Sequence, residues 1–288
     1  MRIAIVADRV GWEERLLLAA AAGRGATAFW LDDGDMCAGP RAASAAPADV
    51  YLIRSRSYTR GAALAGLLSD GGSRVVNTPA AIAVCQDKLA TTRALATAGL
   101  PVPDFRLVLS RKDLRAAVGQ LGLPCVLKPV FGGLGRRVLL IRDRDLAEAS
   151  YDYVEHYGQS FDRVLLAQRY HPGQDQRVIV AGPNVAAAYQ RTGQDDWRAN
   201  VATGAVVSPV PPGSVPHELA VAAANVAGAE VCAVDLLTDP AGGSVICEVN
   251  HVPMFRGAVA ASGRDIAGEI VSYLLAGTPV RDRPGVLA

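Results

Sequence analysis

Residues 128–137 read Lys-Pro-Val-Phe-Gly-Gly-Leu-Gly-Arg-Arg and follow three apolar residues at 125–127. The pattern predicts a strand at 125–129, a glycine-rich turn, and a second strand at 137–141. Glycines let a backbone approach a polyphosphate, consecutive N–H groups can bind its oxygens, and Lys128 adds positive charge. The turn does not open a helix, so it fits neither the Walker P-loop nor the Rossmann fingerprint. By itself, the stretch is compatible with a phosphate-binding turn and equally with an ordinary glycine hairpin.

Acidic residues interrupt two apolar runs further along the chain. Expected strands at 231–237 and 244–249 are joined by Asp-Pro-Ala-Gly-Gly at 239–243, which predicts a hairpin. Strand side chains alternate, so Glu248 and Asn250 point the same way, and the hairpin brings Asp235 beside them. Three oxygen ligands without histidine or thiolate suit Mg²⁺. The alternative is that the two acids pair with arginines, since a buried acid needs a metal or a partner.

Lysine is scarce in this chain. Only three of the 29 basic residues are lysines, namely Lys88, Lys112 and Lys128. An ammonium is a compact, strongly hydrated point charge, whereas a guanidinium is a planar fork, so the two are not interchangeable. Lys112 is expected on the surface of a helix, which leaves Lys88 and Lys128 as candidate ligands.

The composition excludes several classes of protein. With 288 residues, 50% of them hydrophobic and 20% charged, the chain is not intrinsically disordered. A net charge of +1 provides no overall field for nucleic acid or an anionic membrane. No apolar run reaches the roughly 18 residues of a membrane span. Five scattered cysteines favour reduced thiols over disulfides or a zinc site. We therefore expect a cytoplasmic globular protein with no membrane or nucleic-acid partner.

The order of expected elements predicts an α/β fold in three parts. Strands alternate with helices over residues 1–90, which favours a parallel α/β domain. Residues 91–172 form a compact α+β lobe around the glycine-rich turn. Residues 173–288 form a second lobe that carries the acidic hairpin. A dinucleotide-binding oxidoreductase is disfavoured, because residues 2–15 contain Gly11 alone where GxGxxG is needed.

Two sets of arginines add weaker signals. Arg177 and Arg191 lie on consecutive expected strands, and guanidinium groups suit phosphoryl or acyl-phosphate oxygens. Residues 54–61, Arg-Ser-Arg-Ser-Tyr-Thr-Arg-Gly, follow the carboxyl end of an expected strand, where open α/β sheets bind ligands. That loop could bind a carboxylate or could be a solvated basic loop. Each arginine taken singly is also compatible with a solvated surface charge.

Taken together, these residues resemble the ATP-grasp fold, and most closely the RimK/LysX branch of ATP-dependent carboxylate–amine ligases. The resemblance extends over essentially the whole chain. The stretches that carry it are Val76-Asn77-Thr78-Pro79, Asp87-Lys88, Val126-Leu127-Lys128-Pro129, Gln174-Asp175-Gln176-Arg177-Val178, Ala233-Val234-Asp235-Leu236 and Glu248-Val249-Asn250-His251. The last tetrapeptide is characteristic of ligases that attach an amino acid to the terminal glutamate of a small acidic amino-group carrier protein.

The resemblance implies a nucleotide held between the central and C-terminal lobes, and a role for particular residues. The implied ATP ligands are Lys88, Lys128, the flexible loop with Gly132, Gly133, Gly135 and Arg136, and the hinge of Gln168, Arg169 and Tyr170. The implied Mg²⁺ ligands are Asp235, Glu248 and Asn250. Arg177 and Arg191 are the implied catalytic residues, which steady the γ-phosphate and the acyl phosphate. The implied substrate-binding residues are Arg54, Arg60, Asn200, Thr203, Gly257 and Ala258.

The implied reaction is the ADP-forming ligation of a carboxylate to an amine through an acyl phosphate. The expected partners are an amino-acid or peptide substrate, with a small acidic carrier protein as one option, in a homo-oligomer. Thr203-Gly204-Ala205 stands where the family has Arg-Gly-Gly, which supports the alternative of a nucleotide-binding protein that has lost turnover. Gly257-Ala258 matches neither the aminoadipate nor the glutamate ligases, so we expect another substrate, such as one from secondary metabolism.

Overall fold

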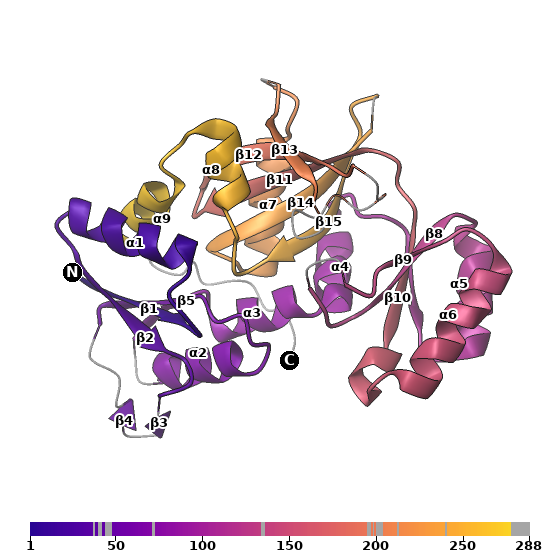
Figure 1. Ribbon diagram of the computed structural model, residues 1–288, viewed down its shortest axis with the longest axis horizontal. Helices are drawn as coiled ribbons and strands as arrows, with labels where there is room; N and C mark the ends of the chain where they lie inside the picture. The colour runs from indigo at the N-terminus through magenta and orange to yellow at the C-terminus, as the bar shows by residue number, and fades with distance from the viewer. Residues whose placement is uncertain are drawn as a thin grey trace.

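The computed structural model describes residues 1–36, 38–39, 42–43, 48–70, 73–133, 136–194, 197, 199, 204–211, 213–239 and 241–277, without the side chains of 38, 39, 42, 43, 160 and 161. Three larger sheets follow one another across the molecule, with the five-stranded sheet between the other two (Figure 1). This is the α/β architecture with α+β lobes that the sequence predicts. No helix among these residues is long and apolar enough to cross a membrane.

The N-terminal sheet is parallel, as the alternation of strands and helices predicts. Its strands are ordered β2-β1-β5-β6. The elements of this part are β1 (Arg2–Ala7), α1 (Trp12–Gly23), β2 (Thr27–Asp32), β5 (Val50–Ile53), α2 (Arg60–Asp70), β6 (Arg74–Val76) and α3 (Pro79–Gln86). Residues 32–49 are expected to be a loop, but β3 (Ala38–Gly39) and β4 (Ala42–Ala43) pair within them. The loop at 54–59 leaves the carboxyl end of β5 and leads into α2.

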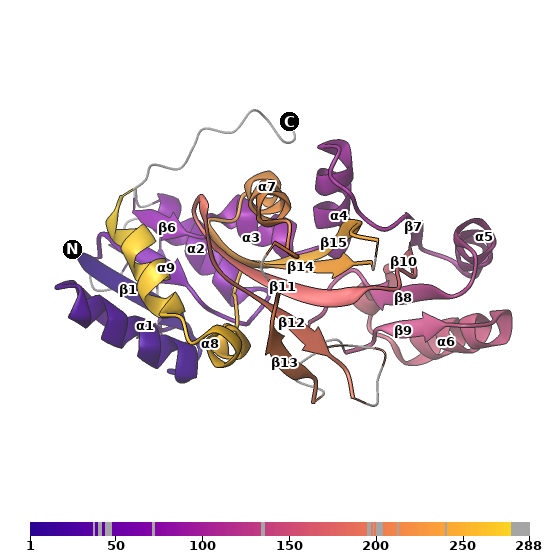
Figure 2. The same ribbon diagram turned by 90° about the horizontal axis from the view of Figure 1, so that it is seen from above.

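The central lobe is an antiparallel sheet of order β7-β10-β8-β9 with two helices on one face. Its elements are α4 (Lys88–Thr97), β7 (Phe105–Val108), α5 (Arg111–Leu121), β8 (Cys125–Pro129), β9 (Leu139–Ile141), α6 (Arg144–Tyr157), the 3₁₀ turn η1 (Ser160–Arg163) and β10 (Leu165–Arg169). Ser110 and Asp143 cap α5 and α6 by accepting hydrogen bonds from backbone N–H groups of the first turn. Both helices pack on one face of the sheet through one apolar cluster (Figure 2). The alternate residues Lys128 and Gln168 belong to the opposite face and are buried there.

The C-terminal lobe is an antiparallel sheet of order β13-β12-β11-β14-β15. Its elements are β11 (Gln174–Ala181), β12 (Asn184–Thr192), β13 (Val206–Pro209), α7 (His217–Ala227), β14 (Val231–Thr238), β15 (Ser244–Asn250), α8 (Arg256–Ser262) and α9 (Ile266–Leu275). The predicted hairpin is confirmed, since β14 pairs with β15. The sequence does not predict β13, a short edge strand that ends on Pro209, or α8, a seven-residue helix that contains Gly257.

One apolar core joins the N-terminal domain to the C-terminal lobe. Residues of β1, α1, β11, β12 and α9 share a single cluster, so these two parts form a continuous interior. A buried amide reinforces the joint. Asn77 Nδ2 donates to the carbonyls of Val231 at 2.8 Å and His251 at 2.9 Å, and its Oδ1 accepts from the N–H groups of Glu230 and Val231. These four hydrogen bonds hold the start of β14 beside the end of β15, where the acidic residues lie.

Candidate functional site

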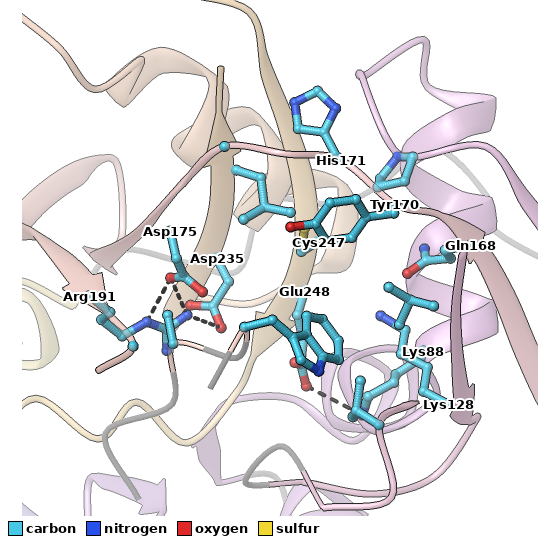
Figure 3. Close-up of a pocket in the computed structure, with 18 of the residues that line it drawn as sticks. Lys88, Lys128, Gln168, Tyr170, His171, Asp175, Arg191, Asp235, Cys247 and Glu248 are labelled. Carbon is cyan, nitrogen blue, oxygen red and sulfur yellow. Dashed lines mark hydrogen bonds and ion pairs between the residues drawn. The ribbon is translucent and has the colours of Figure 1, made fainter. Parts of the chain in front are cut away.

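A cavity of about 560 Å³ lies between the central and C-terminal lobes. Side chains from both lobes and from α4 point into it (Figure 3). It is lined by most of the residues implied by the resemblance, namely Lys88, Lys128, Gly132, Gly133, Arg136, Gln168, Arg169, Tyr170, Arg191, Asp235 and Glu248. The two scarce lysines and the two acids therefore open onto one cavity.

The lysines form one side of this cavity. Lys88 Nζ donates to the carbonyl of Gly132 and lies 3.4 Å from Glu248 Oε1. Lys128 is only 8% exposed and has no hydrogen-bond or ion-pair partner among the residues described. Burial lowers the pKa of the Lys128 ammonium, and the nearby Lys88 charge lowers it further. This side of the cavity holds positive charge that the protein does not neutralise fully.

Arg191 lines the other side of the cavity together with Asp175 and Asp235, whereas Arg177 pairs with Asp235 but is not among the described residues that line the cavity. The charges on this side are matched. Arg177 binds Asp235 through two hydrogen bonds of 2.6 Å, from Nε to Oδ1 and from Nη2 to Oδ2. Arg191 Nη2 lies 2.5 Å from Asp175 Oδ1 and 3.2 Å from Asp235 Oδ2. Burial alone would raise the pKa of Asp235, but the two guanidinium groups outweigh it and lower the pKa to about 2. For Asp175, burial dominates and raises the pKa to about 6.

The register of the sheet explains this arrangement. Arg177 is the cross-strand partner of Asp235, which is in turn opposite Glu248. Asp175 lies two residues before Arg177, on the same face, and is opposite Arg191. Four strands thus present their charged side chains to one surface. The opposite face is apolar and packs against α7.

A β-bulge interrupts the ladder beside the acids. Asp235 pairs with Glu248, but the next residue, Leu236, pairs with Ile246, so Cys247 is the extra residue. Both Cys247 and Glu248 consequently line the cavity, although they are adjacent in sequence. Burial raises the pKa of the Cys247 thiol to about 12, so it remains protonated next to Lys128.

The predicted metal ligands fit a hard cation. Asp235 and Glu248 are directly opposite each other on β14 and β15, and carboxylate oxygens suit Mg²⁺. Asp235 Oδ1 keeps a lone pair beyond the one that Arg177 uses, whereas Oδ2 faces both Arg177 and Arg191. Asn250 does not line the cavity, and its buried Nδ2 has no hydrogen-bond partner among the described residues. Among the described residues, no three His, Cys, Asp or Glu side chains are positioned to hold a metal ion. The structure therefore brings together two carboxylates, and a metal role for Asn250 stays a prediction.

The hinge residues lie where β10 leaves the central sheet for β11. Gln168 is 4% exposed and lines the cavity, and its Nε2 has no hydrogen-bond partner in the part of the chain that the structure describes. The Arg169 guanidinium pairs instead with exposed Asp104 at 3.2 Å. Tyr170 packs edge-on against Trp197, with ring centroids 6.3 Å apart. Gly135, assigned to the flexible loop, lies outside the described residues.

The predicted substrate-binding residues do not gather in this cavity. Arg54 is 2% exposed and donates to Glu14 Oε1 at 2.9 Å and to the Pro253 carbonyl at 2.7 Å. Its guanidinium therefore ties the N-terminal domain to the end of β15, and it is not a solvated charge. Arg60 pairs with buried Asp33 at 3.2 Å.

Neither Gly257 nor Ala258 lines the cavity. A side chain at Gly257 would meet the Tyr189 ring at 3.0 Å, so only glycine fits there without displacement. Ala258 is fully buried in the shared core. Asn200 and Thr203 lie outside the described residues. A substrate role for all six residues stays a prediction.

Sequence reasoning missed Asp175 and Cys247 as cavity residues. Asp175 could have been found, because it stands two residues before Arg177 and strand side chains alternate. Cys247 could not, because alternation from Glu248 places it on the opposite face and a bulge reverses that. Nothing in the residue types at 244–250 indicates the bulge.

Two known protein families match consecutive parts of the chain. Residues 3–84 match a family described as the LysX pre-ATP-grasp domain. Residues 85–274 match the RimK-like ATP-grasp domain.

Individual proteins give the same result. Glutamate–LysW ligase ArgX of Sulfolobus acidocaldarius is 32% identical over 229 residues, which are 78% of this chain and 81% of that protein. The α-aminoadipate–LysW ligase LysX of the same organism is 27% identical over 230 residues, 79% and 82% of the two chains. A crystal structure of a RimK domain ATP-grasp protein from Sphaerobacter thermophilus has a TM-score of 0.79 and 31% identity, covering 95% of this chain and 99% of the other.

Proposed function

The chain belongs to the RimK-like ATP-grasp family, and from that membership we propose that its cavity binds ATP with Mg²⁺ and joins a carboxylate to an amine. The relatives are ligases by name, with glutamate, α-aminoadipate or LysW in those names. One observation carries the proposal. Lys88 and Lys128, two of the three lysines in the chain, line the same cavity as Asp235 and Glu248.

The lysine side suits the phosphates of the nucleotide. Lys128 is a buried ammonium without a partner among the described residues, and an anion would remove that electrostatic penalty. Lys88 and the glycine-rich turn at Gly132 and Gly133 are next to it. The adenine would lie near Gln168 and Tyr170 at the hinge, where Gln168 Nε2 has no hydrogen-bond partner among the described residues.

Asp235, Glu248 and Asn250 would hold Mg²⁺. The ion, when bound, neutralises phosphate charge and orients the γ-phosphate for attack. Contacts within the chain hold the two carboxylates in place, because Arg177 donates hydrogen bonds to both oxygens of Asp235 and Lys88 lies beside Glu248. Carboxylates held in this way are pre-organised and lose little freedom when a cation binds.

The ligation has two steps. A carboxylate oxygen of the substrate attacks the γ-phosphorus of ATP, which gives an acyl phosphate and releases ADP. An amine then attacks the acyl carbon, phosphate leaves with the bonding electrons, and the amine loses a proton. Arg177 and Arg191 provide fixed positive charge beside both steps, while the walls of the cavity exclude water that would hydrolyse the acyl phosphate.

The substrates that fit best are an amino acid as the amine and a carboxylate that is either the terminal glutamate of a small carrier protein or a free amino acid. The names of the relatives, glutamate–LysW ligase and α-aminoadipate–LysW ligase, support this class. We assign residues 1–90 to an N-terminal domain, 91–172 to the central lobe and 173–288 to the C-terminal lobe. A homo-oligomer is the expected state, which light scattering would check.

The test is an ADP-release assay with MgATP and a matrix of carboxylates and amines, including peptides that end in glutamate. The proposal predicts ADP and phosphate release only when a carboxylate and an amine are both present, and mass spectrometry should find the amide. Lys128→Met should abolish release, whereas Lys112→Met, at an exposed lysine of α5, should not. Thermal stabilisation by MgATP without ADP release from any mixture would indicate a nucleotide-binding protein instead of a ligase.

A further inference from the structure

Two consecutive arginines at the end of the glycine-rich turn have different surroundings. Arg136 lines the cavity, and a guanidinium there suits the phosphates of a nucleotide. Arg137 is not among the described residues that line the cavity, and its Nη1 donates a hydrogen bond to Asp162 Oδ1. Neighbouring side chains of the same charge therefore have separate contacts, one in the cavity and one on the central lobe.

Arg137 has an unusual backbone conformation. Its φ is 61°, and it is the one non-glycine residue with a positive φ in the part of the chain that the structure describes. The left-handed region is unfavourable for a residue with a Cβ atom, because the Cβ lies too close to the following carbonyl oxygen. Such a conformation persists where surrounding contacts hold it, and the ion pair with Asp162 is a contact of this kind.

Asp162 is a fixed partner for this ion pair. It belongs to η1, and its side chain is only 11% exposed, whereas that of Arg137 is 52% exposed. Asp162 Oδ2 also accepts a hydrogen bond from the Gln159 N–H at 3.3 Å. Two residues later, the Val164 carbonyl accepts from the Val130 N–H at 3.0 Å. One short segment of the central lobe thus holds both the start and the end of the glycine-rich turn.

The position of Arg136 depends on the conformation of Arg137. β9 begins at Leu139 and is fixed by its pairing with β8. Arg137 is two residues before that strand, so its φ and ψ angles set the direction in which the preceding residue leaves it. A change of Arg137 to the common negative φ would therefore move Arg136 from its place in the cavity.

We propose that Arg137 is a positioning residue, which its ion pair with Asp162 holds in the left-handed conformation so that Arg136 reaches the cavity. The inference rests on the proposed function, since it takes the triphosphate to be the ligand of Arg136. Arg137 itself acts through the backbone and does not contact the nucleotide. Neutralising Asp162 should therefore affect the nucleotide in the same way as removing the Arg137 side chain.

The first test measures the turn in the free protein. Amide hydrogen exchange of a peptide that spans Arg136 and residue 137, corrected for intrinsic rates, is compared by mass spectrometry between wild type, Arg137→Ala and Asp162→Asn. Arg264→Ala is the matched control, because the Arg264 side chain is 50% exposed and pairs with Glu269 away from the cavity. Exchange should be about 3- to 10-fold faster in the first two variants only. Unchanged exchange in Arg137→Ala would overturn the proposal, whatever the outcome of the ligase assay.

The second test is a double-mutant cycle on affinity. Titration calorimetry with Mg-AMPPNP should give a Kd about 3- to 10-fold higher for Arg137→Ala, for Asp162→Asn and for the double variant alike, because all three lose the same ion pair. The Kd for adenosine, which has no phosphate, should not change. Losses that multiply in the double variant, equal losses for both ligands, or a triphosphate affinity of Arg137→Ala within twofold of wild type would each contradict the proposal.

Arg137→Gly separates the backbone from the charge. Glycine populates positive φ as readily as negative φ, so this variant lacks the side chain but keeps access to the left-handed conformation. Its triphosphate affinity should be closer to wild type than that of Arg137→Ala, and equal losses would show that Arg137 acts through its charge instead. If wild type binds neither ligand, the proposed function fails, while the exchange experiment still decides whether the ion pair orders the turn.

Discussion

Both sides of the cavity carry basic side chains, but the arginines on one side are paired with carboxylates and the lysines on the other side are only partly paired. On the arginine side, Arg177 and Arg191 face Asp235 and Asp175 at distances of 2.5–3.2 Å, so each guanidinium has a carboxylate. On the lysine side, Lys88 has Glu248 at 3.4 Å, and Lys128 has no partner among the described residues. The difference separates two tasks. The paired arginines fix the positions of the Asp175 and Asp235 carboxylates. The unpaired Lys128 ammonium attracts an anion.

The same difference predicts opposite effects on stability. A buried charge without a partner is unfavourable, so Lys128 destabilises the folded protein to gain a binding site. Removing one member of a buried ion pair leaves the charge of the other member uncompensated. The Asp235 carboxylate, which pairs with Arg177, therefore stabilises the folded protein. Substitutions on the two sides should therefore separate loss of activity from loss of stability.

The largest effect is expected for Lys128→Met. Met preserves most of the side-chain volume and removes the charge, so the turnover of ATP should fall about 100- to 1,000-fold. The melting temperature should not fall, because the buried ammonium is gone. Steady-state ADP release and differential scanning calorimetry measure the two quantities.

Lys112→Met is the control for this substitution, because Lys112 is exposed and distant from the cavity. It should leave both turnover and melting temperature unchanged. Wild-type turnover in Lys128→Met would contradict the assignment of phosphate binding to the lysine side of the cavity.

The next effect is the loss of stability in Asp235→Asn. The amide cannot neutralise Arg177 and Arg191, so the free energy of unfolding should decrease by about 3 kcal/mol. Asp104→Asn removes an ion pair of similar type at the surface, with Arg169, and should cost less than about 1 kcal/mol. Urea denaturation gives both values, and equal losses would show that burial of the arginine side is irrelevant.

Acid should gradually remove the stability that the Asp235 carboxylate provides. The folded pKa, about 2, lies below the ordinary 3.8, so the folded state favours the charged carboxylate. The stabilisation is complete above about pH 4 and is lost as the pH falls to about 2, a change of about 2 kcal/mol. The difference in unfolding free energy between wild type and Asp235→Asn, measured by urea titration at each pH, should shrink over that range. A difference independent of pH would contradict the assignment.

The smallest effect is expected at the hinge. The Arg169 side chain is 53% exposed and pairs with Asp104, so Arg169→Ala should change the KM for ATP less than about threefold. The substitution keeps the backbone, which the hinge is expected to use for adenine. A tenfold increase of KM in initial-rate assays would show that the guanidinium itself contacts the nucleotide.

Most of the fold follows from local patterns in the sequence. The parallel N-terminal sheet comes from alternating strands and helices, and the β14–β15 hairpin from two apolar runs around a turn. The convergence of Lys88, Lys128, Asp235 and Glu248 on one cavity agrees with what the resemblance to the ATP-grasp fold implies. Strand alternation and the hairpin account only for the position of Asp235 beside Glu248.

Features that depend on contacts between distant segments were not predictable. Arg54 belongs to a loop rich in basic residues, and only the packing of α1 and β15 around it makes it a buried structural ion pair. The bulge at Cys247 depends on how β15 pairs with β14. The periodicity of apolar residues describes one helix or strand at a time, so it carries no information on contacts between segments that are distant in sequence.

A crystal structure with AMPPNP and Mn²⁺ tests the central claim most directly, because anomalous scattering locates the metal independently of the nucleotide. We predict a Mn²⁺ peak within about 2.5 Å of oxygens of both Asp235 and Glu248, with the triphosphate against Lys88 and Lys128. A nucleotide bound elsewhere, or a metal that touches neither carboxylate, would contradict the account.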